Sequence, residues 1–163
     1  DRYLRGGDHI SFNERGYAAV RFTEMAEDFN HQHQNVREEN GARYGDLLEF
    51  VSPRYCALIA KVNAAVLASL ALSPAAPSNF TIVTSQLEYS TAVRWNPNLE
   101  PDIAGYKILI RKTVSPHWER IIDVGNMTTY TVGDFPKDNY LFGLRAYDRD
   151  GNESIVAFPR PGR

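Results

Sequence analysis

The hydrophobic period of this chain changes at a proline-containing segment, residues 73–78 (SPAAPS). Before this segment, apolar residues recur at helical spacing, and after it they alternate with polar residues. Two prolines among small residues form a semi-rigid linker. We therefore expect the 163-residue chain to have two parts, residues 1–73 and residues 74–163.

The second part is predicted to be all-β. Its candidate strands are short, rich in β-branched and aromatic residues, and separated by turn signals such as Asn96-Pro97 and Asp150-Gly151. The predicted strands are residues 79–84, 92–95, 105–112, 119–124, 128–132, 140–147 and 154–158. About seven strands in a segment of this length are typical of a β-sandwich. We expect Trp95 in its core, and Trp118 is the one good candidate for an exposed aromatic residue that contacts carbohydrate.

The first part is predicted to be a fragment of an α/β structure. Ser52 is a plausible N-cap and Pro53 suits the first helical position, so a helix is expected over residues 53–71. Residues 17–22 (YAAVRF) are predicted to form a short buried strand. One strand and one helix cannot close a core, so this part resembles the last βα unit of a larger α/β domain. The fold class of the chain is therefore α+β overall.

Composition argues against two classes of partner. The formal net charge of −2 gives no basic surface for nucleic acid. No uninterrupted apolar run reaches the roughly 18 residues of a membrane-spanning helix, so no membrane span is predicted.

A polar loop carries the residues with the clearest metal chemistry. His31 and His33 alternate in it, and neutral imidazole nitrogens suit zinc. Asp8 and Glu24 supply carboxylates elsewhere in the first part. Taken alone, this pattern is weak, because two histidines in a polar loop are more often solvated than bound to a metal.

Residues 77–161 resemble a fibronectin type III domain, which is an immunoglobulin-like β-sandwich. The similarity is carried by Trp95, by Tyr106 in AGYKI, and by the run from residue 138 to residue 154 (DNYLFGLRAYDRDGNES). The resemblance implies that Tyr140 occupies the tyrosine-corner position of that family.

Residues 1–72 resemble the C-terminal part of metallopeptidase family twenty-eight, the co-catalytic zinc aminopeptidases. The similar features are Asp8-His9-x-x-Phe12, then Gly16-Tyr17-x-Ala, then an acidic loop in which His31 precedes Asn35 by four residues. The resemblance implies two zinc ions in the intact domain and peptide substrates with a free amino terminus. It implies His31 as the last zinc ligand, with His33 as the rival, and Asp8 as a hydrogen-bonding residue beside the metal. The Asp usual in the family is replaced by Asn35.

The remaining ligands and the general base of such an enzyme would lie upstream of this chain. We therefore expect a fragment of a zinc-dependent exopeptidase, inactive on its own, from a secreted or periplasmic bacterial parent. The alternative is a non-catalytic extracellular module whose sandwich contacts a protein, a cell surface or a carbohydrate polymer. Upstream sequence would discriminate between the two.

Overall fold

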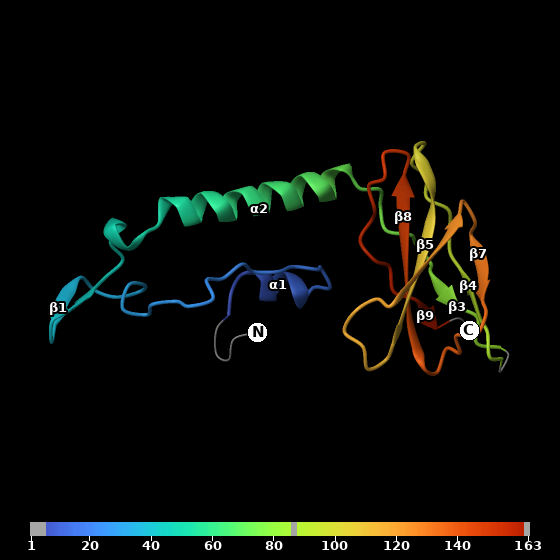
Figure 1. Ribbon diagram of the computed structural model, residues 1–163, viewed down its shortest axis with the longest axis horizontal. Coiled ribbons are helices and arrows are strands. Elements are labelled where there is room, and N and C mark those ends of the chain that lie inside the picture. The colour runs from blue at the N-terminus through green and yellow to red at the C-terminus, as the bar shows by residue number, and fades with distance from the viewer. Residues whose placement is uncertain (1–5, 86–87, 162–163) are drawn as a thin grey trace. The chain divides into compact units, whose positions relative to one another are not determined.

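The computed structural model describes residues 6–85 and 88–161 of the chain (Figure 1). These residues divide into two compact units, Asp1–Cys56 and Ala57–Arg163. The division falls inside the long helix α2 (Pro53–Leu72), whose C-terminal end lies at the predicted linker.

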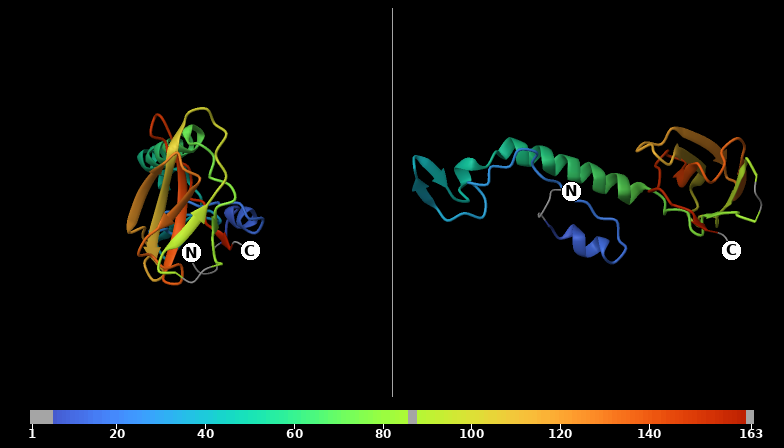
Figure 2. Two further views of the ribbon diagram at one scale, coloured as in Figure 1. Left: turned by 90° about the vertical axis from the view of Figure 1, so that its right-hand side faces the viewer. Right: turned by 90° about the horizontal axis from the view of Figure 1, so that it is seen from below.

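The second unit contains the predicted β-sandwich. One sheet has the strand order β7-β4-β3-β9 and the other has the order β6-β5-β8. The two longest strands, β5 and β8, pair antiparallel over most of their length (Figures 1 and 2). The strands are β3 (Thr81–Ile82), β4 (Thr91–Arg94), β5 (Ile103–Lys112), β6 (Arg120–Gly125), β7 (Thr129–Val132), β8 (Tyr140–Asp148) and β9 (Arg160–Pro161).

The core of the sandwich follows from the period-two pattern. Alternate side chains of a strand face one side of its sheet, so apolar residues on one face become buried together. Trp95 is 5% exposed and packs edge-to-face on Phe80 and Tyr106, which confirms its predicted core position. The Tyr106 hydroxyl accepts a hydrogen bond from the Asn98 backbone N–H at 2.7 Å. The other buried core residues are Val93, Ile108, Ile110, Val124, Val132, Phe142, Leu144 and Ala146.

The outer face of the three-stranded sheet carries a second, smaller apolar cluster. Leu109 is 1% exposed although it points away from the main core. It pairs with Gly143 of β8, and both Trp118 and Val156 lie close over that glycine. Trp118 is therefore half-buried, which weakens its candidacy as a free carbohydrate platform.

The last predicted strand, residues 154–158, is not a regular strand. The segment pairs with β8 only through isolated bridges at Leu144 with Ala157 and at Tyr147 with Glu153. Between them, the hydroxyl of Ser154 accepts the Ala146 N–H at 3.0 Å, which a main-chain carbonyl would accept in a regular ladder. A side chain has thus replaced the backbone partner, and the ladder is interrupted.

Helix α2 begins as predicted. The hydroxyl of Ser52 accepts the backbone N–H of Tyr55 at 3.3 Å, and Pro53 holds the first helical position. None of its residues is buried. Among the described residues, α2 is the one helix long and apolar enough to cross a membrane by length and composition. A core helix of a soluble protein has the same properties.

The first unit differs from the βα unit expected for it. Residues 17–22 form no strand, and Tyr17 and Val20 are 66% and 80% exposed. A strand needs a neighbour to pair with its backbone, and none lies beside this segment within the described residues. The α/β fragment predicted for this unit is therefore not shown by its described residues.

The regular elements of the first unit are short. They are α1 (His9–Asn13), β1 (Arg37–Glu39), β2 (Ala42–Tyr44) and the 3-10 turn η1 (Leu48–Phe50). β1 and β2 form a hairpin around Asn40 and Gly41, whose φ angles are 52° and 77° (Figure 2, right). Asn-Gly is the strongest short hairpin signal in a sequence, and the sequence analysis missed it.

Candidate metal and substrate site

The predicted site residues lie in the first unit, around the loop that precedes the β1–β2 hairpin. His31 is half-buried, and its ring stacks on Phe50 with centroids 3.6 Å apart and planes 7° from parallel. Its Nδ1 atom lies 3.3 Å from Asp28 Oδ2. The ring of His31 is therefore fixed by an aromatic contact on one face and a carboxylate at one nitrogen.

His33 is held in a different way. Its φ angle is 54°, a left-handed conformation that is uncommon for a residue with a side chain. Both carboxylate oxygens of Asp46 accept its backbone N–H, at 3.1 and 3.0 Å. Its side chain is exposed. Asp46 thus stabilises a backbone conformation that presents the imidazole outward, and such local strain is often found at functional sites.

The structure brings Asp8 together with His33. Both line a pocket of about 440 Å³, whose other lining residues include His9 and Arg21. The Nδ1 atom of His9 is buried and makes no hydrogen bond among the described residues. Asp8 precedes α1, and its carboxylate makes no capping bond to that helix. The Asp8 side chain is therefore not used to cap α1.

His31 lines a second and larger pocket, of about 660 Å³. Its wall is partly apolar, from Phe22, Leu47 and Phe50, and partly acidic. The acids include Glu24 and Glu27. The side chain of Glu27 is only 8% exposed, and its Oε1 atom lies 4.0 Å from Arg21 Nη2.

Asn35, which replaces the Asp of the family pattern, is exposed. Its carbonyl accepts a hydrogen bond from Arg37 Nη1 at 3.4 Å. Sequence reasoning missed the carboxylates that contact the two histidine residues, Asp28 and Asp46. The three-residue spacing from Asp28 to His31 could have indicated the first, whereas Asp46 is brought to His33 only by the intervening hairpin.

The described residues do not form a complete zinc site. No group of three or more His, Cys, Asp or Glu side chains within residues 6–85 and 88–161 is arranged to hold a metal ion. Zinc in proteins has about four ligands, of which a catalytic site draws three from the protein.

No protein-family model matches the chain. Curated relatives are similar over almost its whole length. It is 44% identical over 162 residues to a "Probable zinc metalloprotease" of Pyrenophora tritici-repentis, covering 99% of this chain and 33% of that protein. It is 43% identical to a probable zinc metalloprotease of Leptosphaeria maculans, and it covers 37% of that protein. It is 40% identical to a probable zinc metalloprotease of Phaeosphaeria nodorum, and it covers 33% of that protein.

Solved structures are similar over about half of the chain. The FN3 domain of human collagen XX has a TM-score of 0.42 at 17% identity, covering 53% of this chain and 88% of that domain. The FN5 domain of Drosophila Lar has a TM-score of 0.39 at 24% identity, covering 55% of this chain and 99% of that domain.

The relatives also bear on source and completeness. Those named above are fungal, so the expectation of a bacterial parent is not supported. The chain spans about a third of the length of the curated relatives it matches. Its homologues are thus named probable zinc metalloproteases, at 40–44% identity over nearly all of this chain.

Proposed function

We propose that this chain is a region of a secreted zinc-dependent exopeptidase of the aminopeptidase type. The observation that carries the proposal is its 40–44% identity, over 99% of its length, to proteins named probable zinc metalloproteases. The histidine-containing loop and the Asp8 turn, which resemble the co-catalytic zinc aminopeptidases, support the finer assignment. In such enzymes the metals would polarise the scissile carbonyl and activate water.

Within that protein, we assign one zinc ligand to His33 in preference to His31. His33 shares a pocket with Asp8, and its imidazole is exposed on a strained backbone held by Asp46. His31 instead stacks on Phe50 and has Asp28 at its Nδ1 atom. In this assignment Asp8 is a hydrogen-bonding residue beside the site. His31 forms part of the wall of the neighbouring apolar and acidic pocket, which suits the amino-terminal residue of a peptide.

One histidine cannot hold zinc with useful affinity, so the 163-residue chain alone is expected to be inactive. The other ligands of the proposed two-zinc site would come from the part of the protein that this chain does not span. The exposed apolar side chains of α2, such as Leu58, Val62 and Val66, would pack against the same part.

The test uses the full-length parent and measures bound zinc and hydrolysis of leucine p-nitroanilide. We expect His33→Ala to abolish both. Asp8→Asn is expected to lower activity about 10- to 100-fold, the usual cost of losing a residue that supports a metal ligand. His31→Ala should retain zinc and alter mainly KM. His117→Ala, in an exposed loop of the sandwich, is the matched control and should change nothing.

Two outcomes would contradict the assignment. Loss of zinc in His31→Ala, but not in His33→Ala, would return the ligand to His31. A parent protein that binds no zinc and cleaves no peptide would favour the non-catalytic binding module.

A further inference from the structure

The sandwich contains three Asn-x-Ser/Thr triplets, the acceptor motif for N-linked glycans. They are Asn79-Phe80-Thr81, Asn126-Met127-Thr128 and Asn152-Glu153-Ser154. None has proline in the middle position, so all three satisfy the motif. The relatives described above are fungal, and eukaryotic cells attach such glycans in their secretory pathway. The structure distinguishes the three asparagines from one another.

Asn79 and Asn126 have the features of acceptors. Both side chains are exposed, and among the described residues neither side-chain amide makes a hydrogen bond. Asn79 lies just before β3 with a φ angle of 53°, a conformation that asparagine tolerates better than most residues. Asn126 lies in the connection from β6 to β7. A sugar on either nitrogen displaces no contact of the fold.

Asn152 is different. Its Nδ2 atom donates to Asp148 Oδ2 at 2.8 Å, and its backbone N–H donates to Asp148 Oδ1 at 2.8 Å. Asn152 is half-buried, and Ser154 of the same triplet is only 3% exposed. A glycan on Nδ2 would disturb a carboxylate that several loop groups share, which opposes folding of the modified chain.

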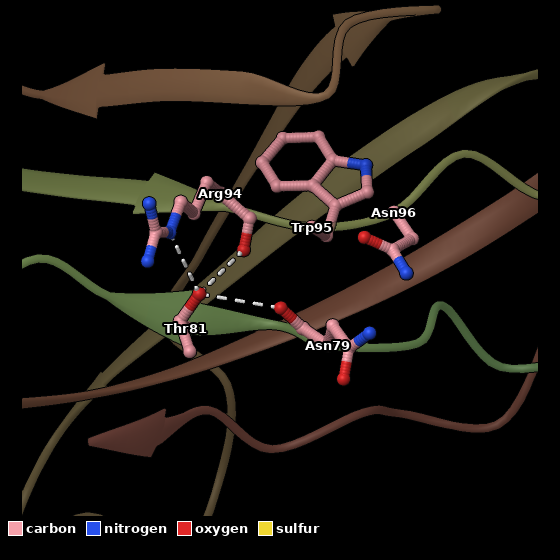
Figure 3. Close-up of a pocket in the computed structure, with 5 residues that line it drawn as sticks. All are labelled: Asn79, Thr81, Arg94, Trp95 and Asn96. Atoms are coloured by element: carbon pink, nitrogen blue, oxygen red, sulfur yellow. Dashed lines mark hydrogen bonds between the residues drawn. The ribbon is translucent and has the colours of Figure 1, made fainter. Parts of the chain in front are cut away.

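A polar pocket lies beside Asn79. It has a volume of about 410 Å³ and is lined by Asn79, Thr81, Arg94, Trp95 and Asn96 (Figure 3). Trp95 is 95% buried, and its indole Nε1 makes no hydrogen bond among the described residues. This nitrogen has almost no exposed surface, so an oxygen-rich group in the pocket would meet the lining polar side chains and not the indole N–H. The donors that such a group would meet are the guanidinium of Arg94 and the side-chain amide of Asn96, both exposed residues that line the pocket.

We propose that Asn79 and Asn126 carry N-linked glycans, that Asn152 does not, and that the first sugar of the Asn79 glycan rests against the pocket formed with Arg94, Trp95 and Asn96. The glycan comes from a lipid diphosphate-linked oligosaccharide. The Nδ2 atom of asparagine bonds to the anomeric carbon and loses one proton. The bond from that carbon to the diphosphate oxygen breaks, and the lipid diphosphate leaves.

This inference rests on passage through the secretory pathway and not on zinc chemistry. If the protein carries glycans but has no peptidase activity, only the proposed function fails. If it is an active peptidase without glycans, only the glycan inference fails.

The first experiment secretes the full 163-residue chain from a yeast host and measures occupancy by glycopeptide mass spectrometry. Asn79→Asp and Asn126→Asp should each remove one glycan, whereas Asn152→Asp should leave the glycan mass unchanged. An unmodified Asn79 or Asn126, or a glycan on Asn152 of the secreted protein, would overturn the assignment of sites.

The second experiment tests the pocket. An endoglycosidase that leaves one N-acetylglucosamine on each site should not change the unfolding midpoint. Complete removal of the glycans should lower it by about 4 °C, as expected for the loss of about one net hydrogen bond from a small domain. Equal midpoints after the two treatments would overturn the role of the pocket. As a control, wild type and Asn79→Asp are produced without glycans in a bacterial host. The difference between their unfolding midpoints gives the effect of the substitution itself.

Discussion

At the scale of single residues, Gly143 shows how one position determines the outer face of a sheet. A Cβ atom at this glycine would lie 2.6 Å from Val156 Cγ1 and 2.9 Å from Trp118 Cη2. Because position 143 has no side chain, Val156 and Trp118 can approach β8 closely. Trp118 is therefore partly buried, although its loop position suggested an exposed side chain. The guanidinium of Arg111 lies 5.5 Å from the centre of the same indole and packs on it.

Gly143→Ala is expected to destabilise the sandwich by about 1–3 kcal/mol, the usual cost of forcing extra atoms into a packed site. Urea unfolding followed by Trp fluorescence measures the change. Gly133→Ala is the control, because a Cβ atom there would meet nothing within 4 Å. Equal losses in the two variants would mean that the contact with Trp118 and Val156 is not what excludes a side chain at position 143.

Among the elements, the segment of residues 153–158 after β8 contacts the sheet through charged hydrogen bonds as well as through isolated β-bridges. Glu153 accepts hydrogen bonds from Lys107 Nζ on β5 at 2.6 Å and from Arg145 Nη1 on β8 at 2.8 Å. The hydrogen bond from Lys107, aided by that from Arg145, lowers the pKa of the Glu153 carboxyl below its ordinary value. One carboxylate thus connects three segments of the outer face.

This connection predicts a pH dependence. Because the folded-state pKa of Glu153 is lowered, its contribution to stability is fully present above the ordinary pKa of a glutamate, about 4.3. That contribution is lost as the pH falls through the lower folded-state value. The difference in unfolding midpoint between wild type and Glu153→Gln should therefore be largest near pH 7 and shrink below about pH 4. A difference that stays constant from pH 7 to pH 3 would show that ionisation of Glu153 is not involved.

At the scale of the whole molecule, the two units differ in completeness. The sandwich has a closed core formed entirely by its own residues. The described residues of the first unit form short elements, expose apolar side chains and line the pockets that contain His31 and His33, and α2 has no buried residue. The first unit therefore leaves more of its apolar surface exposed than the sandwich does.

If the proposed function holds, chelation of zinc from the full-length parent should abolish peptide hydrolysis and leave the unfolding transition of the sandwich unchanged. The described residues of the sandwich contain no group of side chains arranged to hold a metal ion. The calorimetric unfolding midpoint of the sandwich should therefore be the same in the chelated and the zinc-loaded protein. A sandwich transition that shifts on chelation would show that the two units are energetically coupled.

Much of the second unit was predictable because local rules and tertiary packing agree there. Alternation predicted six of the strands and the buried position of Trp95, since one buried sheet face imposes a period of two. In the same way, Ser52 and Pro53 identified the start of α2. The last segment, residues 154–158, was mispredicted because a serine hydroxyl replaced a backbone partner, which no pattern of hydrophobicity records.

The secondary structure of the first unit was less predictable, because its described residues have few neighbouring elements to pair with or pack against. Residues 17–22 have a strand-like composition, yet a strand forms only where another strand accepts its hydrogen bonds. Sequence patterns alone predicted His31 and His33 as candidate zinc ligands and Asp8 as a hydrogen-bonding residue beside them. Their grouping, with His33 beside Asp8 in one pocket and His31 in another, depends on the folded chain. The backbone of His33 is held by Asp46, and the ring of His31 is held by Phe50, which are contacts between residues far apart along the chain.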